Sequence, residues 1–408
     1  MRILQIIHRL YPQNSSGISV YTYALAEGIS RGHSIAVLAV RPGGRSGRTL
    51  LEIERVSDSF SIYWLVLPGK FDLLRWLKIG RIFLKILRDF RPDIVHFQHL
   101  ISLPFFLPFL ARSKGISTAI GLHDYWYICP AITLFHRDGY VCRGPGPGCA
   151  YCVGGRAAPL RYFYRVVKSV LRPCLMRWVL AQADLLLVPS AFVGKKYSVA
   201  GYAVRPLREF KYGCSISGGG AHPRVKGVLR FGYIGGFKAH KGPEVLIRAF
   251  SALRQNAELH LFGWGPQEDI ARCKALAGAD GRIFFHGEFD HGSIRETFSG
   301  FDILVMPSVW EETFGIAAQE AFFFGIPVIA AEIGGLPEQV EHGVNGFLFK
   351  PGDAGSLAAV LEECVLHYNE FIGLMDFNKN LIAISVAVEH MLATYRDLKN
   401  RDDGRVED

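Results

Sequence analysis

Two glutamates in the second half of the chain have a spacing that suits a shared ligand. Glu312 and Glu320 stand eight positions apart, with Phe314-Gly315 between them and a helical pattern that starts near Gly315. If Glu312 precedes the helix and Glu320 lies inside it, both carboxylates can flank a ligand at the helix N-terminus. The free N–H groups near residues 314 to 316 would then face a diphosphate, while one acid binds sugar hydroxyls and the other a ribose diol. The alternative is one continuous helix with both acids on its surface, about 12 Å apart along the axis.

A lysine beside glycines follows the first strand expected in the same half. Residues 231–242 read FGYIGGFKAHKG and end in Lys241-Gly242. A lysine at a strand end can neutralise the charge that builds on a leaving diphosphate. Lys238 or His240 could share this task. The alternative is an exposed lysine in a glycine-rich turn.

Polar residues also follow strand-like runs in the first half. Ser16-Gly17 occupies the loop before the first helical pattern, where small residues let the backbone approach a phosphate or an acceptor closely. His123 directly follows the run 117–122 and should point from the edge of a sheet, although a lone histidine there is often a structural hydrogen-bonder. His96 and His99, near another strand end, are weaker candidates for lining an acceptor site.

The segment 307–349 closely resembles the E-x7-E signature of glycosyltransferase family 4. The elements PS, FG, EA, GIPVIA and GGLPE occur in the family's order, and the resemblance runs from the Tyr11-Pro12 loop to about Ala358. It implies that Glu312 contacts the donor sugar, that Glu320 contacts the nucleotide ribose, and that His123 lies beside the reacting carbon. It also implies a retaining transfer that needs no catalytic metal.

The chain departs from the family pattern at two places. Gly236 stands where an arginine usually precedes Lys241, and Ser16-Gly17 stands where two glycines are common. We therefore expect Lys241, His123 and Glu312 to act in catalysis with a weaker phosphate clamp. The expected donor-binding residues are Ser16, Gly17, Gly235, Gly236, Lys238, Lys241, Glu312, Thr313, Phe314, Gly315, Ile316 and Glu320.

Strand-like runs alternate with helical stretches along the 408 residues, which suits two domains rather than one. In the second half, the five runs expected as strands are 228–234, 258–263, 282–286, 302–306 and 327–330. The pattern and the resemblance predict a GT-B architecture, with two Rossmann-like, doubly wound parallel-sheet domains facing a central cleft. The expected divisions are an acceptor-binding domain at 1–213, a glycine- and serine-rich linker at 214–227 and a donor-binding domain at 228–375. Residues 376–408 would form a helix, which could pack back on the first domain, and a tail.

The net charge of +9 is unevenly divided. Up to Cys214 the chain has 29 Lys and Arg against 11 Asp and Glu, and the remainder has 17 against 26. Residues 68–93 and 160–180 interleave basic and apolar residues at helical spacing, which indicates either an anionic membrane surface or core-facing helices with a solvated basic back. No nucleic-acid motif accompanies the charge, so we expect no nucleic-acid partner.

Cysteines and targeting signals bound the compartment. We see no secretory signal and no spanning helix, and therefore expect a cytoplasmic protein that could lie on the inner face of the membrane. In that compartment the eight cysteines should be thiols or metal ligands. Cys129, Cys142, Cys149 and Cys152 share one loop and could hold a structural Zn²⁺, or could be ordinary thiols.

These observations predict a hexosyltransferase that uses a nucleotide-diphosphate sugar and a saccharide or lipid-linked acceptor in bacterial surface polysaccharide or lipopolysaccharide assembly. Two alternatives remain: a nucleotide-sugar epimerase of the same shape, and a non-catalytic protein that binds a polyanion through its basic half.

Overall fold

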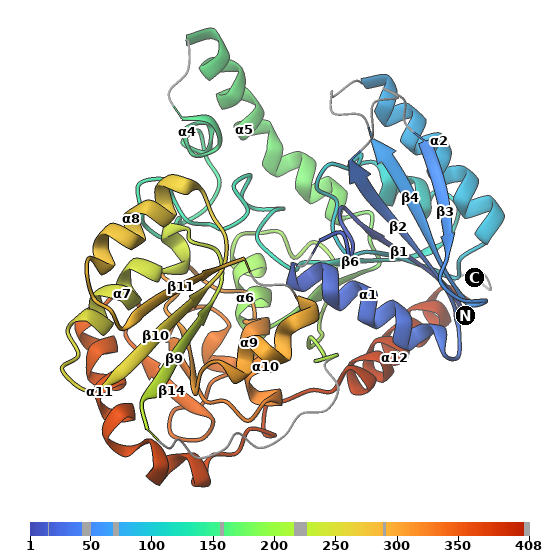
Figure 1. The fold of residues 1–408 in the computed structure, drawn as a ribbon. Helices are drawn as coiled ribbons and strands as arrows, with labels where there is room; N and C mark the ends of the chain where they lie inside the picture. The colour runs from blue at the N-terminus through green and yellow to red at the C-terminus, as the bar shows by residue number, and fades with distance from the viewer. Residues whose placement is uncertain are drawn as a thin grey trace. The chain divides into compact units, whose positions relative to one another are not determined.

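A computed structural model describes residues 1–14, 16–42, 50–67, 73–155, 159–215, 227–288 and 291–403. The chain divides into two compact units (Figure 1). Unit 1 comprises Met1–Ile132, Gly144–Ser215 and Ala383–Asp408, and unit 2 comprises Thr133–Arg143 and Ile216–Ile382. Most of the predicted linker at 214–227, namely residues 216–226, lies outside the described residues.

Over the described residues, the sheet of unit 1 has eight strands in the order β3-β4-β2-β1-β5-β6-β7-β8. The strands are β1 (Arg2–Ile7), β2 (Ser34–Pro42), β3 (Leu50–Arg55), β4 (Phe60–Leu67), β5 (Ile94–Phe97), β6 (Ser117–Gly121), β7 (Leu185–Val188) and β8 (Leu207–Glu209). Of the central strands, β5 and β7 are buried along their whole length and β1 is buried apart from Arg2, as expected for parallel strands covered on both faces.

The edge of this sheet corrects the expectation of purely parallel pairing. Strand β3 runs antiparallel to β4, with Ile53 opposite Tyr63, whereas the other pairs are parallel. The sequence LLEIER mixes charged and apolar residues and stays largely exposed, which is typical of an edge strand. The short strand β8 was also not predicted.

Helices cover unit 1 and include the C-terminal segment. They are α1 (Gly17–Ser30), α2 (Leu73–Phe90), α3 (Leu107–Arg112), α4 (Cys149–Gly154), α5 (Pro159–Leu180), α6 (Ala191–Val199) and α12 (Ile384–Asp403). Helix α12 packs on α1 so closely that a Cβ at Gly28 would lie 2.5 Å from Cγ2 of Val388. Within the described part of the chain, no helix is both long and apolar enough to cross a lipid bilayer.

In the described part of unit 2, six parallel strands follow the order β11-β10-β9-β12-β13-β14. They are β9 (Leu229–Ile234), β10 (Ala257–Phe262), β11 (Ile283–Gly287), β12 (Ile303–Met306), β13 (Val328–Ala331) and β14 (Gly346–Phe349). The first five confirm the predicted alternation, and β14 is an additional strand inside the segment that carries the glutamates.

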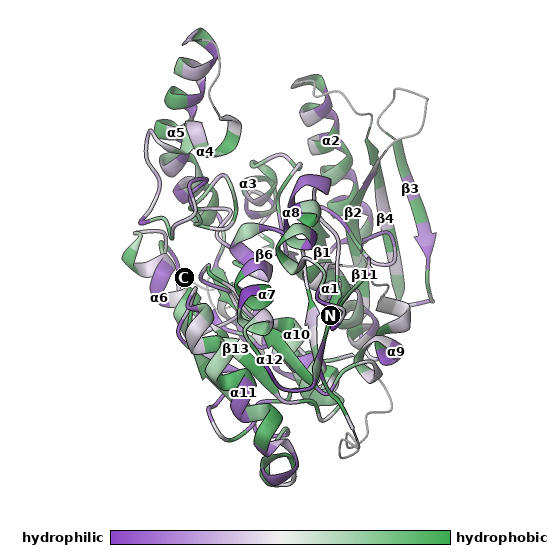
Figure 2. Ribbon diagram, turned by 60° about the vertical axis from the view of Figure 1, so that its left-hand side comes forward, coloured by the Kyte–Doolittle hydropathy of each residue, from purple (hydrophilic) through white to green (hydrophobic). Residues whose placement is uncertain are grey.

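The helices of unit 2 lie on both faces of its sheet, so the doubly wound prediction is confirmed. One core cluster includes residues of α7 (Pro243–Ser251), α8 (Gln267–Ala277) and α11 (Ala354–Phe371), and the other includes residues of α9 (Ile294–Ser299) and α10 (Ile316–Phe323). Apolar strands lie between these helix layers (Figure 2). Both sheets therefore end in loops at the carboxyl edges of parallel strands, where ligands of such folds bind.

Candidate active site

Two loops of unit 2 touch through their backbones. The loop between β9 and α7 meets the loop between β12 and α10, where the N–H of Val309 donates to the carbonyl of His240 at 2.9 Å. Gly242 has φ of +71°, and a Cβ there would lie 1.9 Å from the carbonyl oxygen of Pro307. Only glycine satisfies both conditions, so Gly242 fixes Lys241 beside the second loop.

This contact brings Lys241 and Glu312 together. The Lys241 ammonium donates to Oε1 of Glu312 at 2.7 Å, and the Ser308 hydroxyl donates to the same oxygen at 2.7 Å. Glu312 is 6% exposed. Burial would raise the pKa of its carboxyl, but the attraction and hydrogen bond of Lys241, with the Ser308 hydrogen bond, outweigh burial and hold the pKa below its usual value. Glu312 is therefore a buried, ionised carboxylate.

An aromatic ring lies against the same lysine. The Lys241 ammonium is 5.0 Å from the centroid of the Trp310 ring, and the rings of Trp310 and His240 are 5.4 Å apart. Burial, followed by the positive charge of Lys241, lowers the pKa of His240 to about 4. His240 is consequently neutral near pH 7 and can supply hydrogen bonds but no charge.

The two glutamates sit on different elements. Glu312 lies in the loop before α10, and the half-buried Glu320 lies within the helix. Gly315, with φ of +95°, occupies the N-cap position, and no side chain caps the helix there. The Glu312 carbonyl accepts from the N–H of Gly335 at 2.7 Å, which ties this loop to the segment after β13. Thr313, Phe314 and Ile316 complete the entry to α10, whose N-terminus can bind an anion.

A third loop adds an exposed aromatic ring that sequence reasoning missed. The backbone N–H of Gly235 donates to the carbonyl of Phe262 at 3.0 Å, and the N–H of Phe237 donates to the carbonyl of Trp264 at 2.9 Å. Trp264 is 60% exposed, and the Lys238 ammonium lies 5.9 Å from the centroid of its ring. A Cβ at Gly236 would meet only the Trp264 carbonyl, at 3.6 Å. A tryptophan two residues beyond a strand was the signal available in the sequence.

In unit 1, His123 is part of a buried chain of hydrogen bonds. Its Nε2 lies 2.8 Å from Oε1 of Gln98, and its Nδ1 bonds the Tyr212 hydroxyl. Burial, with smaller contributions from the charges of His96, His99 and His8, holds the pKa of His123 well below its usual value. A neutral ring that donates from Nε2 to Gln98 and accepts from Tyr212 at Nδ1 satisfies both bonds.

The chain continues to the C-terminal helix. The Tyr395 hydroxyl lies 2.7 Å from Nδ1 of His96, and Nε2 of Gln98 lies 3.4 Å from the same nitrogen. Burial lowers the pKa of His96 to about 3. The roles of Gln98, Tyr212 and Tyr395 were not visible in the sequence, because 89 and 299 positions separate the tyrosines from their histidines.

The remaining predicted residues of unit 1 lie at neighbouring loops. His99 contacts Asp124, with 3.1 Å between Nε2 and Oδ2, and accepts from the N–H of Ile101 at Nδ1. The exposed Ser16 is the N-cap of α1 and is held by Asn14, whose Oδ1 accepts from the Ser16 hydroxyl at 2.5 Å and from its N–H at 3.2 Å. Gly17 is the first residue of α1.

The four cysteines proposed as zinc ligands fall in different units. Cys142 belongs to unit 2, whereas Cys129, Cys149 and Cys152 belong to unit 1, and all four are thiols. Within the described ranges, no group of three or more His, Cys, Asp or Glu residues is placed to hold a metal ion. The structure therefore gives the zinc hypothesis no support.

Two family models match the chain. Residues 16–208 match the model described as glycosyl transferase 4-like domain, and residues 229–367 match glycosyl transferases group 1. Among solved structures, the chain is similar to sucrose-phosphate synthase from Thermosynechococcus elongatus, with a TM-score of 0.71, 19% identity and coverage of 97% of this chain and 98% of the other. It is also similar to HepE of Anabaena in complex with UDP and glucose, with a TM-score of 0.68, 16% identity and coverage of 97% and 99%.

Several curated relatives match over shorter stretches. Sulfoquinovosyl transferase SQD2 of Arabidopsis thaliana is 31% identical over 212 residues, which are 47% of this chain and 38% of that protein. Alignments with several such relatives cover only 24 to 38% of their lengths. The two doubly wound units are those of the GT-B architecture. The chain belongs to the glycosyltransferase superfamily.

Proposed function

We propose that the protein is a retaining glycosyltransferase that moves a hexose from a nucleotide-diphosphate sugar to a saccharide or lipid-linked acceptor. The observation that carries the proposal is the ion pair of Lys241 with the buried Glu312 beside the uncapped N-terminus of α10. Further support comes from HepE, a neighbour in fold whose structure contains UDP and glucose. The biological role that we propose is a step, carried out in the cytoplasm, in the synthesis of a bacterial surface polysaccharide.

The charges of unit 2 suggest how the donor binds. The diphosphate would lie between Lys241 and the first turn of α10, because both supply positive charge to its oxygens. The carboxylate of Glu312 repels phosphate and would accept hydrogen bonds from the sugar hydroxyls. Glu320, one turn into α10, would bind the ribose diol.

Transfer then depends on the departure of the nucleoside diphosphate. As the bond between the sugar carbon and the phosphate oxygen breaks, negative charge grows on that oxygen. We assign its stabilisation to Lys241 and the helix terminus, without a metal ion. The acceptor hydroxyl would attack from the face that the diphosphate leaves and pass its proton to the departing diphosphate oxygen. His123, as a neutral imidazole, would hydrogen-bond the sugar near the reacting carbon.

A binding screen followed by a transfer assay tests the proposal. Thermal shifts with UDP, ADP and GDP and their sugar conjugates should identify one base, and a radiolabelled donor then reports transfer. Glu312→Gln keeps the shape and should lower kcat by about 10²- to 10³-fold. Glu320→Ala should weaken donor binding about 10-fold or more, since hydrogen bonds to charged groups contribute about 1.5–3 kcal/mol.

Glu268→Ala, an exposed acid of α8, is the matched control and should leave both quantities unchanged. Transfer at the wild-type rate by both site variants would remove the proposed site. Release of free, epimerised sugar whether or not an acceptor is present would instead identify an epimerase.

A further inference from the structure

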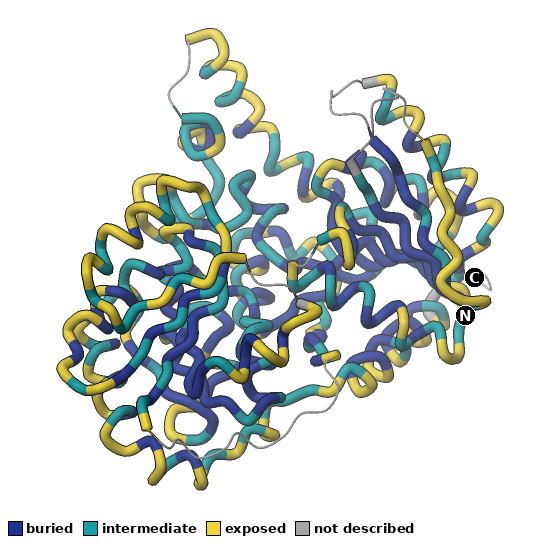
Figure 3. The backbone as a smooth tube through the Cα atoms, viewed as in Figure 1, coloured by how far each residue is buried: buried dark blue, intermediate teal, exposed yellow. Residues whose placement is uncertain are grey.

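Helix α5 exposes a continuous apolar stripe. Leu160 is 83% exposed, Phe163 is 65% exposed and Leu171 is 62% exposed. Tyr164, Val167 and Trp178 are also exposed, and the separations of three, four and seven residues along this set place it on one side of the helix. Only Ser169, Met176, Val179 and Leu180 of the 22 residues are buried, and the first turns extend away from the sheet of unit 1 (Figures 1 and 3). Exposed apolar surface of this extent marks an interaction site.

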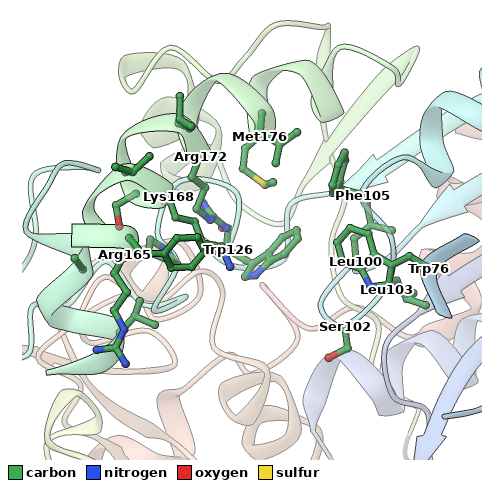
Figure 4. Close-up of a pocket in the computed structure, with 18 of the residues that line it drawn as sticks. Trp76, Leu100, Ser102, Leu103, Phe105, Trp126, Arg165, Lys168, Arg172 and Met176 are labelled. Carbon is green, nitrogen blue, oxygen red and sulfur yellow. The ribbon is translucent and has the colours of Figure 1, made fainter. Parts of the chain in front are cut away.

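A large cavity lies against the same helix within unit 1. Its volume is about 870 Å³, within the range of small-molecule pockets. Most of its lining is apolar. Figure 4 shows Phe105, Leu103 and Trp76 on one side and Trp126 with the α5 residues Lys168 and Arg172 on the other. The cavity is therefore suited to a hydrocarbon chain whose end carries negative charge.

Among the described residues, the cations on the cavity side of α5 have no acidic partner. Arg161, Arg165, Lys168 and Arg172 recur at helical spacing and all line the cavity. Arg172 donates to the carbonyls of Trp126 and Tyr127, and Arg165 donates to that of Gly154. No ion pair involves these four side chains in the part of the chain that the structure describes, and the sequence has seven Lys and Arg but no Asp or Glu between Asp138 and Asp184. Like charges on successive turns repel, so an anion would stabilise this face.

We propose that α5 and its cavity bind a phosphate-headed lipid of an anionic bilayer. The stripe from Leu160 to Trp178 lies in the bilayer surface, the cavity takes one hydrocarbon chain, and Lys168 with Arg161 contacts the phosphate. A soluble polyanion would engage the cations but would leave the stripe exposed. The binding of this lipid does not depend on the proposed function. Only the further step, that the lipid is the carrier of the acceptor saccharide, rests on the proposed function.

Vesicle flotation of the full chain tests the surface part. Wild type should bind phosphatidylcholine vesicles containing phosphatidylglycerol, and should bind pure phosphatidylcholine at least 10-fold more weakly. L160E/F163E should lose at least 10-fold in binding to the anionic vesicles. The matched control V199E/L374E adds the same charge at side chains that are 80% and 84% exposed elsewhere, and should bind as wild type does.

Tryptophan quenching tests the cavity. A single-chain alkyl phosphate with a brominated chain should quench Trp76 and Trp126, which line the cavity, at concentrations below micelle formation. The same chain with a neutral head should quench several-fold more weakly, and inorganic phosphate should not quench. Lys168→Gln should raise the half-quenching concentration several-fold, whereas Lys195→Gln, on α6, should not change it.

The outcomes separate this inference from the proposed function. Equal binding of L160E/F163E and wild type to anionic vesicles would overturn the docking surface, and quenching that is insensitive to the head group would overturn the phosphate contact. Binding of heparin but not of vesicles would identify a polyanion site instead. The donor-induced thermal shift, which reports unit 2, should be unchanged in every variant. Its loss in wild type would count against the proposed function alone.

Discussion

The sheet edges of the two units carry different polar chemistry. In unit 2, the loops after β9 and β12 place an ammonium 2.7 Å from a buried carboxylate, and glycine backbones hold the loops together. In unit 1, residues in and after β5, His123 after β6 and Tyr395 of α12 form a chain of uncharged groups that runs from Tyr395 through His96 and Gln98 to His123. The first edge is held by backbone contact and an ion pair, and the second by side-chain hydrogen bonds.

The difference follows from the cost of burial. A buried charge is stable only beside a partner, which Glu312 has in Lys241, whereas the imidazoles of His96 and His123 avoid the cost by staying neutral. The ammonium of Lys241 at this edge suits an anionic ligand such as a diphosphate, and the carboxylate of Glu312 suits hydroxyl groups. An edge of neutral donors and acceptors suits hydroxyl groups, because it can bind them without a competing charge.

We expect the largest effect from a substitution that breaks the backbone contact between the two loops of unit 2. Gly242→Ala should destabilise unit 2 by about 3–5 kcal/mol, because the new Cβ would meet the Pro307 carbonyl at 1.9 Å and the backbone has φ of +71°. Urea denaturation followed by Trp310 and Trp264 fluorescence reports it. Lys241 should then no longer reach Glu312, so donor binding should fall as well.

Gly343→Ala separates the steric clash of the new Cβ from the backbone strain of a positive φ. Gly343 has φ of +76°, but a Cβ there meets nothing within 4 Å. It should therefore cost only the backbone strain, about 1–3 kcal/mol, and leave donor binding intact. Equal losses in the two variants would show that the loop contact contributes nothing beyond glycine's conformational freedom.

Much of the fold could be predicted from the sequence, because buried parallel strands are short apolar runs between helical patterns. All five strands predicted for unit 2 exist. Strands β3 and β14 were missed for opposite reasons. The sequence LLEIER of β3 is charged and reads as an exposed loop, and β14 lies inside a segment whose glutamates drew the interpretation toward ligand binding.

Helices α2 and α5 show where sequence pattern stops being informative. Both mix basic and apolar residues at helical spacing, and both allowed a core-facing or a membrane-facing interpretation. In α2 the apolar residues Ile79, Phe83 and Ile86 are at most 2% exposed, whereas α5 leaves most of its stripe in solvent. Periodicity fixes which residues share a side of a helix, but only the packing of the whole unit decides what that side faces.

The candidate site was predictable in part for the same reason. Glu312, Lys241 and His123 could be singled out because each follows a strand or opens a helix within a recognisable motif. The partners of the buried polar residues could not be assigned. Ser308 stands in the PS element, but the sequence does not show that it donates to Glu312, and Tyr395 approaches His96 only through the packing of α12. Contacts across hundreds of positions depend on tertiary structure, which one sequence without its fold does not specify.

The pH dependence of stability is a second test of the contrast between the neutral edge of unit 1 and the charged edge of unit 2. Unfolded His96 takes up a proton below about pH 6.5, but the folded residue resists protonation until about pH 3. Unfolding therefore takes up a proton between these values, and the stability of unit 1 should fall as the pH falls through this window. Glu312, with its lowered pKa, contributes stability that is lost only below its unfolded value of 4.5.

A variant is needed because His240 of unit 2, with a pKa of about 4, titrates in the same window. His96→Gln should flatten the dependence of the unfolding free energy on pH between 6.5 and 4.5 by up to about 1.4 kcal/mol per pH unit. Chemical denaturation at a series of pH values measures this slope. An unchanged slope would mean that His96 is already solvated or protonated in the native protein.

The smallest effect probes the far end of the hydrogen-bonded chain. Tyr395→Phe removes one hydroxyl from a fully buried ring and should cost about 1 kcal/mol. Tyr368→Phe is its counterpart in unit 2, where the hydroxyl donates to the Asp302 carbonyl at 3.3 Å, and should cost a similar amount.

The two variants should differ in acid, because losing the Tyr395 donor makes neutral His96 less favourable and raises its pKa. Imidazole titration by NMR should therefore show the His96 pKa moving upward in Tyr395→Phe alone. Unchanged titration in both variants would show that the hydroxyl supports the packing of α12 without holding His96 neutral.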